Sequence, residues 1–196
     1  MKLFLKLILL NFLALGFFAI SCKKDINSNA EENDALFEKL NNYYISVGYN
    51  PIKKTDIDEI TRLTIDGESK RDYKMIKFLS VFYKLSSLSL QNLKFSHVPS
   101  TELGNLERIS LGELVIENCD ITDEQLSLFI NKANKIFRVA IFNAPNITDK
   151  SLDLLLSLKE IDEIYVVNTG ISQEGMSKLS SKFGEKLREP GHVLGE

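Results

Sequence analysis

Cys119 and the carboxylates that follow it are the residues of this chain whose types most readily suggest chemistry. They lie in the stretch LVIENCDITDEQL, residues 114–126, where Asp120, Asp123 and Glu124 follow the thiol. A thiol beside carboxylates can serve as a nucleophile or as a metal ligand. A cysteine is equally a small apolar side chain that packs inside a protein.

The rest of the sequence lacks the partners that either chemistry needs. A nucleophilic cysteine needs a base beside it, and neither His97 nor His192 belongs to the same segment. Asp123 and Asp149 are too far apart along the chain to share one calcium-binding loop. The sequence contains no GxSxG, no HExxH and no glycine-rich phosphate loop. We therefore predict no enzyme, no catalytic or metal-binding residue and no cofactor, with Cys119 in the core.

The composition suits one globular domain with a sizeable core. The 196 residues are 44% apolar and 26% charged. Lys and Arg number 24 against 27 Asp and Glu, a net charge of −3. So weak an acidity argues against a nucleic-acid partner. Two cysteines cannot build a disulfide framework, and two histidines are too few for a zinc site.

The amino terminus has the pattern of a secretory signal peptide. Lys2 and Lys6 precede the apolar run LILLNFLALGFFAI, which is short for a transmembrane helix. The same run also fits a retained membrane anchor. The segment AISC resembles a bacterial lipobox, and this resemblance implies a signal peptide over residues 1–21 and lipidation of Cys22, with palmitate among the acyl chains. Residues 22–33 would then be a lipidated cysteine with a flexible tether.

Five pairs of alternating aliphatic residues recur at an interval of 25 or 26 residues. The pairs are Leu63/Ile65, Leu88/Leu90, Leu114/Ile116, Val139/Ile141 and Ile164/Val166. Alternation places both members of a pair on one face of a β-strand. Regular recurrence indicates one structural unit that is repeated and stacked.

This pattern resembles the leucine-rich repeat, of the cysteine-containing or T-x-ITD type, over residues 57–187. The resemblance rests on LGELVIENCDI, IDEIYVVNTGI and the segments ITDEQL and ITDKSL. It implies a short α/β solenoid of about five repeats, with a parallel sheet on the concave face and helices on the convex face. Residues 34–60 would form an amino-terminal helical cap, residues 61–187 the repeats with a final capping helix, and residues 188–196 a tail.

Some copies depart from the pattern, and others carry helix-capping residues. The first copy is weak after Ile65, the second has SHVPSTELGNL in place of a helix, and the fourth has one extra residue around Pro145. Thr122, Thr148 and Ser172 stand where helix N-caps are expected, and TDEQ has the spacing of a capping box.

A row of asparagines recurs just after the expected strands. Its members are Asn92, Asn118, Asn143 and Asn168. Asparagine readily adopts the tight backbone conformations of turns. The same row also fits a polar rim for a ligand, and the sequence leaves the two interpretations open.

The residues between the aliphatic pairs should face outward and are the candidates for binding. In the last copies they form an aromatic and aliphatic patch with charged neighbours, the composition of an interaction surface. We predict as partner-binding residues Arg138, Phe142, Glu163, Tyr165 and Val167. Two plainer interpretations are that such residues favour strands and that the tail REPGHVLGE lies over them.

Taken together, these patterns favour a non-catalytic recognition module anchored in the bacterial outer membrane by lipid alone. The family resemblance implies a protein partner most often and a glycan in some cases, and we expect a monomer. An alternative is a periplasmic structural or immunity-type lipoprotein that blocks a partner protein. Protease added to whole cells distinguishes the two, since it reaches only a surface-exposed protein.

Replacing Cys22 with Ala should release the protein from membranes, because the acyl chains would have no attachment point. Cell fractionation and labelling with a palmitate analogue measure this. Unchanged retention of the variant in the membrane fraction would contradict lipidation.

Overall fold

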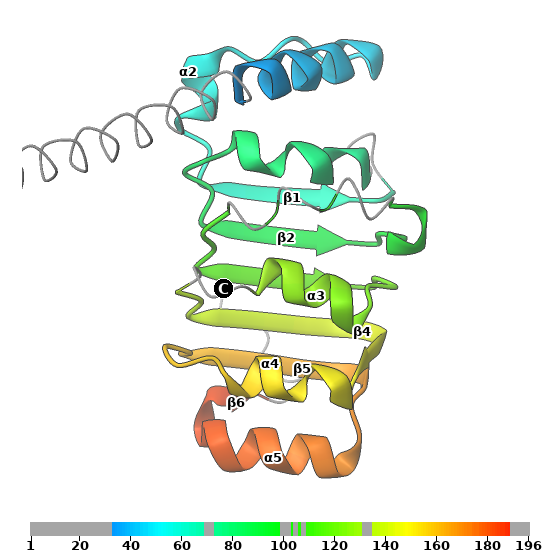
Figure 1. Ribbon diagram of the computed structural model, residues 1–196, viewed down its shortest axis with the longest axis vertical. Helices are drawn as coiled ribbons and strands as arrows, with labels where there is room; N and C mark the ends of the chain where they lie inside the picture. The colour runs from blue at the N-terminus through cyan, green and yellow to red at the C-terminus, as the bar shows by residue number, and fades with distance from the viewer. Residues whose placement is uncertain are drawn as a thin grey trace, which may run out of the picture.

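The described part of the chain forms one parallel sheet with helices against it (Figure 1). The computed structural model describes residues 33–68, 73–98, 103, 106, 109–130 and 135–188. The sheet has six strands in the order β1-β2-β3-β4-β5-β6, all parallel. The strands are β1 (Arg62–Asp66), β2 (Ser87–Gln91), β3 (Glu113–Glu117), β4 (Arg138–Thr148), β5 (Glu163–Gly170) and β6 (Leu187–Arg188).

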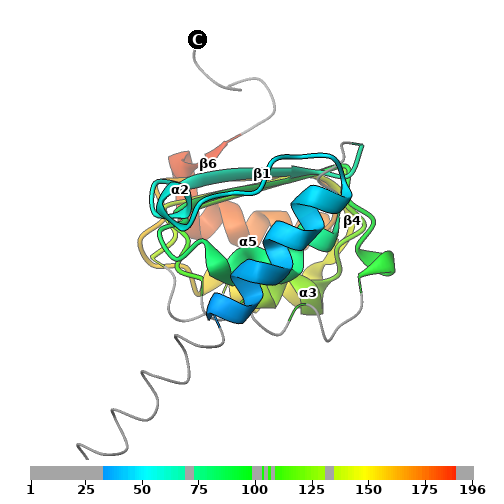
Figure 2. The same cartoon turned by 90° about the horizontal axis from the view of Figure 1, so that it is seen from above.

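The longer helices that follow the strands lie on one face of this sheet, as the view from above shows (Figure 2). Those that cover this face include α3 (Asp123–Phe129), α4 (Leu152–Leu156) and α5 (Gln173–Phe183). The other helical segments are α2 (Lys54–Ile57), η1 (Tyr73–Val81), η2 (Phe95–His97), η5 (Asp149–Ser151) and η6 (Gly184–Lys186). We call the opposite face the outward face; among the described residues, no helix covers it.

The strand register places each predicted aliphatic pair beside the next. Leu63, Leu88 and Leu114 are aligned neighbours, and Val139 and Ile164 continue the row. Both members of all five pairs are buried. The predicted α/β class and parallel sheet are confirmed, and the core lies between the sheet and its helices.

Helical residues 33–46 and α2 cover the β1 end of the core. Leu40, Tyr44 and Ile57 are buried there, and the Tyr43 ring lies 5.9 Å from that of Phe78. Residue 33, predicted in the tether, already belongs to this helix.

The predicted signal peptide, Cys22 and the rest of the tether lie outside the described residues. Along the described part of the chain, no helix combines the length and the apolar character needed to cross a membrane.

The predicted helix caps are present. The Thr122 hydroxyl accepts a hydrogen bond from the Gln125 amide at 3.3 Å, and the Gln125 side chain accepts one from the Thr122 amide at 3.0 Å. Thr148 and Ser172 cap the next two helical segments through their hydroxyls. These bonds satisfy amide groups that a helix start leaves without intrahelical partners.

The irregular copies depart from the pattern where the sequence predicts. Among the described residues between β2 and β3, the helical ones are 3-10 and none is α-helical; they include the short helix η2. In β4, the pairing with β5 shifts between Ala144 and Thr148, which accommodates the extra residue around Pro145. A side chain at Gly170 would come within 2.5 Å of the Pro145 carbonyl oxygen, so this position of β5 requires glycine.

The sixth strand was not predicted. Leu187 and Arg188 follow α5 and pair with Ile164 and Tyr165 of β5. The sequence places Arg188 in the tail, because two residues without an alternating partner pair give no strand pattern. The strand forms because α5 returns the chain to the edge of β5.

The four asparagines all have a positive φ, between 51° and 54°. Their side chains form a ladder: Asn118 donates to Asn92 at 3.2 Å, and Asn143 to Asn118 and Asn168 to Asn143 each at 2.8 Å. At the β1 end, Asn92 donates to Asp66. Asparagine tolerates this left-handed region better than most residues. Asn92 and Asn118 adopt it just after their strands, whereas Asn143 and Asn168 adopt it within β4 and β5.

Asp123 links one copy to the next. Its carboxylate accepts hydrogen bonds from the amide and hydroxyl of Thr148, at 2.8 and 2.7 Å, and from the Ser151 hydroxyl. Burial by itself raises the pKa of Asp123, but the hydrogen bonds from Ser151 and Thr148 outweigh it, so the pKa lies below its ordinary value.

Asp123→Asn should therefore lower the free energy of unfolding by about 1–2 kcal/mol at neutral pH. Because the folded-state pKa is lowered, the stabilisation is complete above about pH 4 and is lost as pH falls through the folded value. Urea unfolding at several pH values measures it. The control is Glu124→Gln, which changes the exposed neighbouring carboxylate and should have little effect; equal effects of the two changes would contradict this role.

Candidate functional site

The outward face carries three rows of side chains that the register aligns across the strands. The first row runs Arg62, Ser87, Glu113, Arg138, Glu163; the second Thr64, Ser89, Val115, Ala140, Tyr165; the third Asp66, Gln91, Glu117, Phe142, Val167. These are the residues that alternation predicted to face outward, because side chains of a strand alternate between the two faces of its sheet. From β3 to β5 the first row stays charged, whereas the second and third rows become more apolar than they are in β1 and β2.

A hollow of about 420 Å³ lies over the second and third rows. Its lining residues all come from β2 to β5: Ser89, Gln91, Val115, Glu117, Arg138, Ala140, Phe142, Asn143, Tyr165, Val167 and Asn168. Its volume lies within the range of small-ligand sites and is also sufficient for a few side chains of a protein partner.

Two aromatic side chains form part of its wall. The rings of Phe142 and Tyr165 lie 5.7 Å apart, tilted by 45°. Phe142 is partly exposed, but Tyr165 is only 4% exposed. Tyr165 is therefore largely a supporting residue, and Phe142 offers more surface to a ligand.

Arg138 is bound by neighbours on both sides. Its Nη1 lies 2.6 Å from Oε1 of Glu113, and its Nε lies 3.3 Å from Oε2 of Glu163 without hydrogen-bonding geometry. The guanidinium also lies 5.8 Å from the centre of the Tyr165 ring. Ser87 donates to the other Glu113 oxygen at 2.7 Å. This network fixes the Arg138 side chain beside the hollow.

Burial by itself raises the pKa of Glu113, but hydrogen bonds from Ser87 and Arg138 outweigh it, so the pKa lies below its ordinary value. Glu113 is therefore ionised at neutral pH and compensates the charge of Arg138.

The structure brings the predicted binding residues together. Arg138, Phe142, Tyr165 and Val167 line the hollow, and Glu163 contacts it through Arg138. Sequence reasoning did not propose Glu117 as a binding residue, although its place beside Phe142 in the aligned row was available from the 25-residue interval. Gln91 was likewise not proposed, although the same interval places it beside Glu117 in this row.

Cys119 lies inside the protein, as predicted. It is 2% exposed, and its Sγ lies 3.5 Å from the Leu90 carbonyl oxygen and 3.3 Å from that of Glu117. Burial raises the pKa of the thiol to about 11. A thiol with so high a pKa carries almost no thiolate at neutral pH, so its geometry fits a packing role.

The acidic residues near Cys119 bind amide and hydroxyl donors of neighbouring segments. Asp120 accepts hydrogen bonds from Phe95 and Ser96, and Asp149 accepts one from the Ser172 amide at 2.8 Å. Within the part of the chain that the structure describes, no three His, Cys, Asp or Glu side chains are grouped to hold a metal ion. His192 lies outside that part.

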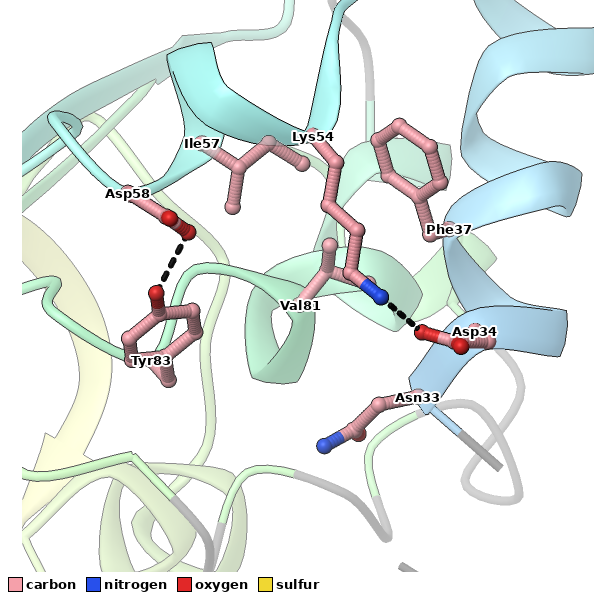
Figure 3. Close-up of a pocket in the computed structure, with 8 residues that line it drawn as sticks. All are labelled: Asn33, Asp34, Phe37, Lys54, Ile57, Asp58, Val81 and Tyr83. Atoms are coloured by element: carbon pink, nitrogen blue, oxygen red, sulfur yellow. Dashed lines mark hydrogen bonds and ion pairs between the residues drawn. The ribbon is translucent and has the colours of Figure 1, made fainter. Parts of the chain in front are cut away.

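Another hollow, of about 220 Å³, lies between helical residues 33–46, α2 and the end of η1 (Figure 3). Phe37, Ile57 and Val81 form its apolar lining. Lys54 pairs with Asp34 across one side, and the Tyr83 hydroxyl donates to Asp58 on the other. The first contact joins residues 33–46 to α2, and the second joins the residue after α2 to the segment that follows η1. Both therefore hold the amino-terminal helices in place over the β1 end of the core.

Comparison with known proteins adds no relative: no family model matches the chain, and neither a curated protein nor a solved structure does. The interpretation of the site therefore depends on its geometry.

The Cys119 thiol should resist alkylation by iodoacetamide at pH 8 in the folded protein and react once the protein is unfolded in guanidinium. The reasons are its burial and its raised pKa. Mass spectrometry of the peptide that contains Cys119 measures the labelling and separates it from Cys22. Rapid labelling of the folded protein would indicate an accessible, reactive thiol instead.

Proposed function

We propose that this chain is a leucine-rich repeat lipoprotein that binds a protein partner through the hollow of its outward face. Cys22 would carry the acyl chains that hold it at the outer membrane. The domain itself would act as a non-catalytic recognition module.

The assignment to leucine-rich repeats is supported by the recurrence of one unit. Aliphatic pairs align in neighbouring strands, and capped helical segments return the chain behind the sheet. An asparagine with positive φ recurs at the equivalent position of four copies, just after β2 and β3 and within β4 and β5. A stack of such units explains why segments of 25 or 26 residues repeat so evenly.

The hollow over β2 to β5 is the observation that carries the binding proposal. It combines aromatic and aliphatic walls with a fixed charged network, the usual composition of residues that dominate binding energy. The walls of the hollow belong to strands that pair on both sides. Binding would therefore require little ordering of the protein, which favours affinity.

An enzymatic role has no comparable support. The one cysteine among the described residues is buried with a raised pKa, and the carboxylates near it bind neighbouring amides and hydroxyls. The hollow itself contains one arginine and one glutamate as its charged lining residues, and no histidine or cysteine.

Phe142→Ala should weaken partner binding about 30-fold, because loss of an anchoring aromatic residue costs about 2 kcal/mol. The measurement has two stages: crosslinked pull-down from intact cells identifies proteins captured by the parent chain, and titration with the purified partner then compares affinities. Thermal unfolding of each variant verifies that the fold persists.

Phe137→Ala is the matched control. Phe137 is 47% exposed, lies just before β4 and does not line the hollow. The Phe137→Ala change removes the same type of side chain from a position outside the hollow and should therefore leave the affinity unchanged. The hollow would be excluded as the interface if the Phe142→Ala variant still captured the partner. It would also be excluded if the two changes reduced capture equally.

A further inference from the structure

The chemistry of the partner can be inferred from the polar groups that line the hollow of the outward face. Its charged lining residues are Arg138 and Glu117. Arg138 is paired with Glu113 and Glu163 and lies over the Tyr165 ring. Because its charge is compensated by two carboxylates, Arg138 is a poor site for an anionic partner group.

Glu117 differs from Arg138 in having no such compensation. Its carboxylate makes no hydrogen bond or ion pair with any residue that the structure describes. It is partly buried on β3, between Gln91 and Phe142 in the aligned row. A carboxylate accepts hydrogen bonds and donates none, so the hollow presents an uncompensated negative charge.

The surroundings of Glu117 are suited to a long side chain. Val115 and Val167 contribute aliphatic surface, and Phe142 contributes a partly exposed ring next to the carboxylate. An aliphatic stem packs on such surface while its charged end pairs with a carboxylate. A guanidinium can in addition stack on an aromatic ring and bind a carboxylate through two parallel hydrogen bonds.

The geometry points to a basic side chain of the partner, an arginine, that pairs with Glu117 and lies against Phe142. The occupant would be a protein segment that presents this arginine to the hollow. This inference rests on the proposed binding function and adds to it the charge and shape of the group recognised.

The test uses a small probe, N-acetylarginine methylamide, and its uncharged isostere, N-acetylcitrulline methylamide. Each is titrated into the full-length, isotope-labelled protein in a non-ionic detergent, and nuclear magnetic resonance follows the amides of Val115, Ala140 and Val167. The arginine probe should shift these signals with an affinity at least about tenfold above that of the citrulline probe, the ratio expected for pairing with a charged group.

Glu117→Gln removes the charge and keeps the shape of the side chain, so it should abolish the preference for arginine over citrulline. Glu124→Gln is the control, because Glu124 is exposed on α3, away from the lining of the hollow. It should leave the preference intact. Equal binding of both probes to the parent chain, or a preference that survives Glu117→Gln, would overturn the inference, as would shifts caused by a neutral disaccharide but not by the arginine probe.

The outcome is separable from that of the proposed function. If Phe142→Ala abolishes capture of the partner but arginine shows no preference, the hollow is an interface and only the inferred chemistry is wrong. If Phe142→Ala leaves capture intact, the proposed function fails whatever the probes do. If both results agree with expectation, arginines in the captured partner become the next residues to replace.

Discussion

The structure depends on one constraint, the in-register pairing of parallel strands that come from successive segments of the chain. Each segment brings a few aliphatic side chains to one face of its strand, too few to stabilise a folded unit alone. Leu90, Ile116 and Ile141 become fully buried because their strands are aligned neighbours. The core is therefore a property of the stack, and a slip of one residue in any strand would expose its aliphatic residues.

Polar side chains that link each strand or segment to the next maintain this register. The asparagine ladder joins each turn to the next at one end of the strands, and Asp120, Asp123 and Asp149 accept donors of adjacent segments near the helix starts. Glu113, Arg138 and Glu163 form a similar link across the outward face. The hollow lies above this fixed framework, where the large side chains of Arg138, Phe142 and Tyr165 stand near small ones such as Ser89 and Ala140. Its shape follows from which residues occupy equivalent positions, and no separate loop is needed to build it.

Much of this arrangement could be predicted from the sequence, since the interval of the aliphatic pairs gives strand order, register and the outward rows. Thr122, Thr148 and Ser172 predicted the helix caps because capping depends on local spacing. Strand β6 could not be predicted, because Leu187 reaches Ile164 only as a result of the path that α5 takes. The local sequence does not show that path. The burial of Tyr165 was also missed: alternation gives the face on which a side chain lies, but its exposure depends on neighbours such as Arg138 and Phe142. Glu117 was underestimated for a related reason, since an uncompensated charge is recognised only when its surroundings are known.

The shift of pairing in β4 has a wider consequence. The added residue near Pro145 is taken up where the strand approaches its turn, and Ala140, Ile141 and Phe142 keep the same alignment with β5 as their counterparts in regular copies. Changes of chain length can thus be absorbed at the rim while the residues on the sheet stay in position. Insertions and deletions in such a molecule can accumulate in the connections, and recognition can evolve by substitution on the strands, each largely independent of the other.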